Sequence, residues 1–391
     1  MTAEEQEIRK RLLSTCDLAE LLLAACSNEG VDRVVDLYQK AGDEAAWTAA
    51  CAHELESHIA HKLLERLSHE DVPERWKAAH DRVALQIGAY MGLLDEMAAA
   101  LEARGIPMIA LKNAGIARGI YPCHGCSPMG DLDVLVRKAD FAAAHAAIQD
   151  LGYTCSTRSL YEAGDELAGG LEYKRQTPEA GDVWLEVQWR AVAGRWIQPS
   201  QEPDAEELLS RSVAIDGTAV RLLSPEDNLL QVCLHTAKHS YLRAPGLRLH
   251  TDVERIVRGT EIDWDCFLRN VLSLRVRTAV YFSLWLPALL MGTPVPTVVL
   301  EQLEPPRWKR DRILHTLLRA GLFYPHAGKK FTRTGYLLMN SLLYDDLGSL
   351  ARAVLPDRRA MAQQYGSSNL FSLPFQHARR LADLCFRRTG I

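Results

Sequence analysis

The segment Met129-Gly130-Asp131-Leu132-Asp133-Val134-Leu135-Val136 constrains the fold of this chain more than any other. Its apolar and β-branched residues predict a short strand that follows a turn. Because side chains alternate between the faces of a strand, Asp131 and Asp133 lie on one face, about 7 Å apart along the chain. Two such carboxylates repel each other, and a buried strand needs a cation to compensate them. The pattern favours a divalent-metal site for phosphoryl or nucleotidyl transfer, and two solvated acids are the alternative.

The rest of the chain places this strand in a small sheet. Residues 1–104 have helical periodicity, residues 105–223 mix strands with short helices, and residues 224–391 are helical again. The other expected strands lie at 106–112, 153–158, 170–176 and 182–189, with a hairpin at 213–223. The sequence therefore predicts an α+β protein of three domains. A small mixed sheet at 105–223 forms the core, between a helical N-terminal part and a helical C-terminal part.

A third carboxylate interrupts one of these strands. Glu186 lies within the otherwise apolar run Val183-Trp184-Leu185-Glu186-Val187-Gln188-Trp189. Its natural role is that of a third acid beside Asp131 and Asp133, since metal-assisted phosphoryl transfer uses clustered carboxylates. The alternative is a glutamate on the exposed face of an edge strand.

Three blocks of sequence occur in an order that is more specific than any one block. They are Ala110-Leu111-Lys112 with Tyr121-Pro122 and the segment 129–136; Trp184-Leu185-Glu186-Val187-Gln188-Trp189; and Leu223-Ser224-Pro225-Glu226-Asp227, followed by His235, Lys238-His239 and Asp252. With these blocks, the chain resembles the uncharacterised bacterial branch of the nucleotidyltransferase superfamily, which has a polymerase-β-like fold. The resemblance covers roughly residues 106–257.

The resemblance implies a two-metal enzyme that moves an NMP from an NTP, with ATP as the expected donor, to a hydroxyl of a small molecule, peptide or protein. Asp131, Asp133 and Glu186 would be catalytic and would hold two Mg²⁺ ions. Glu186 would complete the second ion and help to remove the proton of the acceptor hydroxyl. The expected nucleotide-binding residues are Lys112, Asn113, Gly130 and Lys238.

Two positions depart from the pattern of this branch. Asn113 stands where a glycine usually follows the strand lysine, and Ser127 stands where an arginine usually precedes the two aspartates. The glycine lets the backbone approach phosphates, and the arginine neutralises them. Gly115 and Gly119 are expected to supply flexibility instead. These departures favour a second hypothesis, an inactive nucleotidyltransferase fold that binds a nucleotide or a protein partner, whereas the three intact acids favour the enzyme.

The sequence Cys123-His124-Gly125-Cys126 has the CxxC spacing of zinc and redox sites. Zinc needs four ligands, and no second cysteine pair lies nearby, so zinc or redox chemistry is the lesser alternative. His124 or Cys155 could contribute a further ligand. A long helix predicted at residues 45–67 carries three further histidines, which we expect at the surface: His53, His58 and His61.

A second group of histidines faintly resembles the metal site of phosphohydrolases. His235 and His239 lie four residues apart, but Thr251 separates His250 from Asp252, whereas those enzymes use adjacent residues. We therefore expect polar histidines near the active cleft.

Composition narrows the partners and the compartment. The net charge of −5 gives no reason to expect a nucleic-acid partner. The longest apolar run, residues 279–292, is too short to span a bilayer, so no membrane partner is expected. Nine scattered cysteines and a charged, polar start to the chain are typical of reduced thiols in a cytoplasmic protein.

Overall fold

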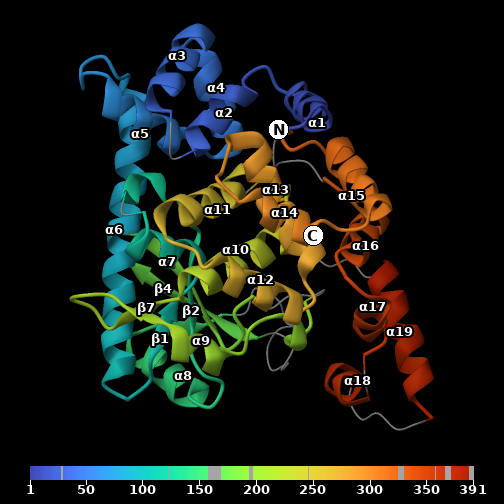
Figure 1. Ribbon diagram of the computed structural model, residues 1–391. Helices are drawn as coiled ribbons and strands as arrows, with labels where there is room; N and C mark the ends of the chain where they lie inside the picture. Colours follow the sequence, from blue (N-terminus) through green and yellow to red (C-terminus); the bar gives the residue numbers. More distant parts are fainter. Residues whose placement is uncertain are drawn as a thin grey trace.

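A mixed sheet lies in the lower half of the computed structural model, with helices on both sides (Figure 1). The structure describes residues 1–27, 30–121, 123–156, 169–192, 197–244, 246–324, 330–356, 358–365 and 371–386. The prediction of an α+β protein with a sheet core between helical parts is confirmed.

Seven described strands form the sheet, in the order β3-β4-β5-β2-β1-β7-β6. Strand β2 lies parallel to β5 and antiparallel to β1, and β1 lies parallel to β7. The predicted strand at 153–158 is limited to two residues, and its positions 157 and 158 lie outside the described residues. The bounds are β1 Met108–Ala110, β2 Asp131–Leu135, β3 Thr154–Cys155, β4 Gly170–Thr177, β5 Gly181–Gln188, β6 Val213–Ala214 and β7 Val220–Leu222.

The two faces of β2 meet different layers. Leu132 and Val134 belong to a hydrophobic core shared with α6 (Glu74–Glu102) and α8 (Phe141–Asp150). Leu135, on the opposite face, belongs to the core of the C-terminal helices α10 (Pro225–Lys238), α11 (Leu247–Gly259) and α13 (Arg277–Met291). By strand alternation, Asp131 and Asp133 share that second face. Each of these two hydrophobic cores contains residues from both sides of a predicted domain boundary, at 104 or at 223. The division into three domains stays a prediction.

The N-terminal helices are α1 (Ala3–Leu13), α2 (Ala19–Cys26), α3 (Val31–Ala41), α4 (Asp43–His53) and α5 (Glu56–Arg66). The single long helix predicted at 45–67 is wrong, because Glu54 adopts a left-handed φ of +55° that ends α4 before α5 begins. The surface position predicted for the histidines is also wrong. Helix α5 packs against α2, α3 and α6, which buries His58, half-buries His61 and leaves His53 buried at the end of α4.

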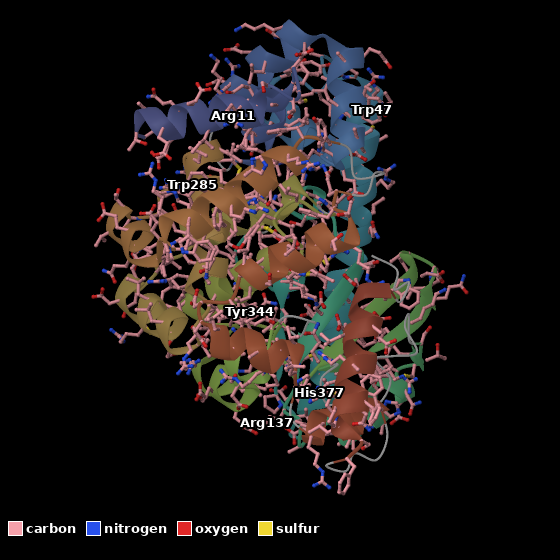
Figure 2. All side chains as sticks on the ribbon, turned by 90° about the vertical axis from the view of Figure 1, so that its right-hand side faces the viewer. Arg11, Trp47, Arg137, Trp285, Tyr344 and His377 are labelled. Atoms are coloured by element: carbon pink, nitrogen blue, oxygen red, sulfur yellow. The ribbon has the colours of Figure 1, made fainter. Side chains whose placement is uncertain are left out.

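Helices α15 to α19 lie along one edge of the molecule, at the right in Figure 1. Figure 2 turns this edge toward the viewer, with Tyr344 and His377 among the labelled side chains. Among the described residues, no helix has the length and apolar character needed to cross a membrane. The remaining helices are α7 Lys112–Gly119, η1 His124–Cys126, η2 Pro199–Gln201, α9 Ala205–Arg211, α12 Trp264–Ser273, α14 Thr297–Leu303, α15 Arg307–Ala320, α16 Arg333–Leu342, α17 Leu347–Val354, α18 Arg358–Tyr365 and α19 Leu373–Phe386.

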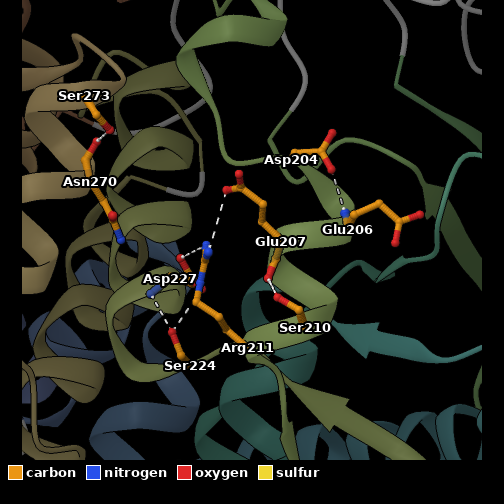
Figure 3. Close-up of polar contacts among 9 residues, drawn as sticks. All are labelled: Asp204, Glu206, Glu207, Ser210, Arg211, Ser224, Asp227, Asn270 and Ser273. Carbon is orange, nitrogen blue, oxygen red and sulfur yellow. Dashed lines mark hydrogen bonds and ion pairs between the residues drawn. The ribbon is translucent and has the colours of Figure 1, made fainter.

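An ion pair between a half-exposed arginine and a buried aspartate joins the sheet region to the C-terminal helices (Figure 3). At the end of α9, Arg211 donates to both carboxylate oxygens of Asp227, over 2.8 and 3.1 Å. The side chain of Asp227 is fully buried in the first turn of α10, where the Ser224 hydroxyl also donates to it over 3.0 Å. This contact fixes the start of α10 against α9.

We expect Asp227→Asn to lower the free energy of unfolding by about 2 kcal/mol, because it removes a charged acceptor from a buried hydrogen-bond network. Glu207→Gln is the matched control. Its carboxylate lies 3.7 Å from the same guanidinium, but its side chain is 66% exposed, and exposed pairs contribute about 0–1 kcal/mol. Urea denaturation of both variants measures the difference, and equal losses would contradict this account.

Candidate active site

Three acidic side chains converge on one face of two adjacent strands. Asp133 of β2 pairs in register with Glu186 of β5, and Asp131 lies two residues earlier on the same face. Neighbouring strands lie about 4.8 Å apart, so paired side chains on one face are neighbours. Glu172 of β4 pairs with Glu186 in turn, which adds a fourth acid to this face. Sequence reasoning missed Glu172, because nothing local indicates that β4 and β5 pair in this register.

Lys112 lies directly against the acids. Its ammonium nitrogen is 2.5 Å from Asp133 Oδ1 and 3.8 Å from Glu186 Oε2, and its side chain is 11% exposed. Gln188 Nε2 donates to the same Asp133 oxygen over 2.8 Å. Lys112 also has a left-handed φ of +51°, which is strained for a residue with a side chain. Such strain is concentrated at functional sites, where the surrounding structure holds it in place.

The charges of this cluster shift one another's protonation. Burial raises the pKa of the Asp133 carboxyl, the Lys112 charge opposes that rise, and the Asp131 and Glu186 charges add to it. Burial also acts to raise the pKa of Glu186, but the Lys112 and Lys238 charges outweigh it, so the net shift is downward. Burial disfavours the charged form of Lys112, yet the surrounding carboxylates raise its pKa. The site therefore holds an ionised Glu186 and a charged Lys112.

The two glycines of α7 allow close packing, which corrects the expectation that they supply flexibility. A Cβ atom on Gly115 would lie 2.8 Å from the backbone oxygen of Ala110, at the end of β1. On Gly119 it would lie 2.2 Å from a methyl carbon of Leu222, on β7. The backbone oxygen of Ala110 cannot move away, so Gly115 lets α7 approach the sheet this closely, whereas at Gly119 the Leu222 side chain could shift. The result is a fixed position for Lys112 at the start of α7.

Asn113 contacts Asp252 on α11. With its amide nitrogen facing Asp252, that nitrogen lies 2.7 and 3.2 Å from the two carboxylate oxygens. Asp252 is buried, which raises its pKa to about 7 against the opposing charges of Arg255 and Arg248. Asn113 therefore links α7 to α11. This contact gives the asparagine side chain a structural role at the position where the resemblance leads one to expect glycine.

The other predicted binding residues lie around the same edge. Gly130 is exposed beside Asp131, and a Cβ atom there would have no neighbour within 4 Å. Lys238 Nζ donates to the backbone oxygen of Val192 over 3.2 Å, while its charge acts on Glu186. Ser127 turns its hydroxyl back to the oxygen of Cys123, over 3.1 Å.

A guanidinium does lie beside the loop that precedes β2, although Ser127 does not supply it. Arg248, on α11, donates to the backbone oxygen of Pro128 over 2.8 Å. Local sequence patterns do not indicate this residue, because Arg248 follows Pro128 by 120 positions in the chain.

The nearby histidines have no metal-binding geometry with Asp252. Burial lowers the pKa of His239 to about 3 and that of His235 well below its ordinary value, so both rings are neutral. The two rings pack edge to face, 4.7 Å between centroids. His250 Nε2 pairs with the backbone oxygen of Tyr241 at 2.9 Å. This arrangement agrees with polar histidines packed among their neighbours rather than a phosphohydrolase centre.

Comparison with known proteins places the chain in a family. Residues 39–292 match the family described as "Uncharacterised nucleotidyltransferase". The match covers more than half of the chain and includes every described strand of the sheet and all three acids. A comparison with curated proteins gave no match. The chain therefore belongs to this uncharacterised nucleotidyltransferase family.

Proposed function

We propose that the protein is a Mg²⁺-dependent enzyme that transfers an NMP from an NTP, with ATP as the donor, to a hydroxyl of a small molecule, peptide or protein. The observation that carries this proposal is the convergence of Asp131, Asp133 and Glu186 on one face, beside Lys112. Family membership supports the reaction class. The described cysteines are free thiols, which supports a cytoplasmic location.

The donor set fits Mg²⁺, which takes oxygen ligands and is usually bound by one or two carboxylates together with substrate phosphates. Burial and the charges of Asp131 and Glu186 raise the pKa of Asp133 against the opposing charge of Lys112, so negative charge is concentrated at this carboxyl group. Two Mg²⁺ ions held by Asp131, Asp133 and Glu186 would supply charge neutralisation at the phosphates and a more acidic acceptor hydroxyl.

The chain's own groups then have distinct tasks. The ionised Glu186 accepts the proton of the acceptor hydroxyl. The acceptor oxygen forms a bond to the α-phosphorus while the bond from that phosphorus to the pyrophosphate oxygen breaks. Lys112 leaves Asp133 and neutralises phosphate oxygens, with Lys238 as a second cation. Exposed Gly130 lets the nucleotide approach Asp131. Positioning and fixed charge are the main sources of rate in such reactions.

A second function has one observation in its favour. Lys112 and Gln188 already satisfy one oxygen of Asp133, and Asn113 is occupied by Asp252. An acid cluster whose charge is partly compensated by Lys112 does not need a metal for the fold to be stable. Such a protein could bind a nucleotide or a protein partner and have no turnover.

One experiment separates the two functions. The melting temperature is measured with Mg²⁺ alone, ATP alone and both, for the parent and for Asp133→Asn, because a ligand that binds only the folded state must raise it. Labelled NTPs are then incubated with the protein and a cell extract. The enzyme predicts a joint Mg²⁺-ATP shift and a labelled product, both absent in Asp133→Asn. A joint shift without label supports a nucleotide-binding protein without turnover. The absence of both contradicts the enzyme and nucleotide binding, and favours a protein that binds a protein partner.

The same labelled product identifies the acceptor. Sensitivity to protease indicates a peptide or protein, and passage through a small-pore filter indicates a small molecule. Sensitivity to ribonuclease would contradict the expectation that nucleic acid is not the partner, which rests on the acidic net charge of −5.

A further inference from the structure

Four potential metal ligands meet where the loop before β2 contacts the N-terminal helices. Cys123 precedes the turn η1 and Cys126 is its last residue. His61 lies on α5 and His80 lies on α6. One ligand atom from each lies within 4.8 Å of all the others. Cys123 Sγ is 3.5 Å from His61 Nδ1, 3.8 Å from His80 Nε2 and 3.0 Å from Cys126 Sγ.

The distances suit a tetrahedral ion. Zinc binds thiolate sulfur at about 2.3 Å and imidazole nitrogen at about 2.0–2.1 Å, which separates neighbouring ligand atoms by about 3.3–3.8 Å. The two sulfur–nitrogen distances, 3.5 and 3.8 Å, fall within this range. The sulfur–sulfur distance of 3.0 Å is well beyond the bonded length of about 2.05 Å, so the two cysteines are separate thiols. It is shorter than the separation of about 3.8 Å for two zinc-bound sulfurs, so the two thiols move apart when the ion binds.

The second nitrogen of each histidine faces a carboxylate. His61 Nε2 lies 3.0 Å from Glu65, and His80 Nδ1 lies 3.6 Å from Asp81. Metal-binding histidines commonly donate their other N–H to a carboxylate, which fixes the ring and the free nitrogen. In the tautomer that donates to the carboxylate, each ring offers its other nitrogen to a metal ion beside Cys123.

The turn itself is shaped for the His80 ring. A Cβ atom on Gly125 would lie 2.1 Å from His80 Nε2, so the imidazole occupies the space that any other residue would fill. The His61 and His80 rings stack with centroids 5.8 Å apart and planes 8° apart.

We propose that this cluster is a structural Zn²⁺ site, with Cys123 Sγ, Cys126 Sγ, His61 Nδ1 and His80 Nε2 as its four ligands. Tetrahedral sulfur and nitrogen donors select zinc. Four protein ligands leave no position for substrate, which is the mark of a structural rather than a catalytic site. Each of the two cysteines loses its thiol proton to solvent when it binds the ion. A redox CxxC pair is the rival. It uses the histidines only to activate a thiol, and it leaves unexplained why four donor atoms gather around one point.

The site fixes the loop that leads to the acids. Asp131 follows Cys126 by five positions, so an ion there ties the start of β2 to α5 and α6. On the other side, Arg255 of α11 donates to the backbone oxygen of Cys126 over 2.7 Å, and Arg248 holds Pro128. Zinc would therefore act as a positioning element for the proposed active site.

Metal analysis of the full chain, purified without chelator, tests the site. We expect one zinc per chain, and a near-complete loss in Cys126→Ser and in His61→Ala. Two controls should keep the zinc: His124→Ala, within the same turn, and Cys155→Ser, an exposed cysteine. Asp131→Asn should also keep it, so failure of this proposal is distinct from failure of the nucleotidyltransferase proposal.

Cobalt substitution of the parent protein keeps the test valid if a variant does not fold. Cobalt(II) should give intense visible bands of a tetrahedral site and a thiolate charge-transfer band, both lost on adding excess zinc. Absence of metal together with a Cys123–Cys126 disulfide in mass spectra would establish the redox pair instead. Absence of metal with two free thiols, or zinc retained in both ligand variants, would equally overturn the proposal.

Discussion

Asp131→Asn and Asp133→Asn should each weaken Mg²⁺-nucleotide binding and stop turnover together, whereas Glu186→Gln should stop turnover and leave that binding nearly intact. The two aspartates share one face of β2, so each loss removes a charged ligand from the same place. Glu186 comes from β5 and is held ionised beside Lys112 and Lys238. Loss of a positioned base lowers the rate by about 10² to 10⁴, and loss of a metal ligand should add to that.

Nucleotide affinity by calorimetry and pyrophosphate release, measured side by side, separate these roles. Asp182→Asn is the matched control, because Asp182 is an acid of β5, like Glu186, but its side chain is 52% exposed beside Lys174. Glu172→Gln shows whether the fourth acid of the face takes part. If Glu186→Gln releases pyrophosphate at the parent rate, Glu186 is only a strand residue of the sheet.

The sheet could be predicted from the sequence because its signals are local. Alternation within 131–135 puts two acids on one side of β2 whatever else the chain does. The apolar run around Glu186 indicates a strand for the same reason. Glu186 lies beside Asp133 because of the register between β2 and β5. No local pattern predicts that register, and only the resemblance to a family placed the three acids together.

The contacts that complete the site join distant parts of the chain, and local patterns carry no signal for them. Asn113 finds Asp252 on α11, and the thiol of Cys123 lies beside histidines that are 43 and 62 positions earlier. Sequence reasoning sought zinc ligands near the CxxC turn and expected His61 at the surface. Only the packing of α5 and α6 around η1 brings these side chains together.

Lys112→Met should make the metal-free protein markedly less stable and make Mg²⁺ a stronger stabiliser. The buried ammonium of Lys112 lies against Asp133 and near Glu186, so it is the counter-ion of the acid cluster in the absence of metal. Removing one partner of a buried ion pair costs about 3–5 kcal/mol, because it leaves uncompensated charge. A divalent ion replaces that charge, and its binding free energy adds to the stability of the folded state.

Thermal unfolding across a Mg²⁺ titration measures this effect, with Lys138→Met as the control because Lys138 is exposed just beyond the end of β2. The rise in melting temperature from zero to saturating Mg²⁺ should be larger for Lys112→Met than for the parent, and unchanged for Lys138→Met. Turnover should fall in Lys112→Met even at saturating Mg²⁺, by about 10²-fold, since a donor to the developing phosphate charge is lost. An unchanged metal-free stability, with an unchanged response to Mg²⁺, would show that Lys112 is not the counter-ion and that the acids are compensated elsewhere.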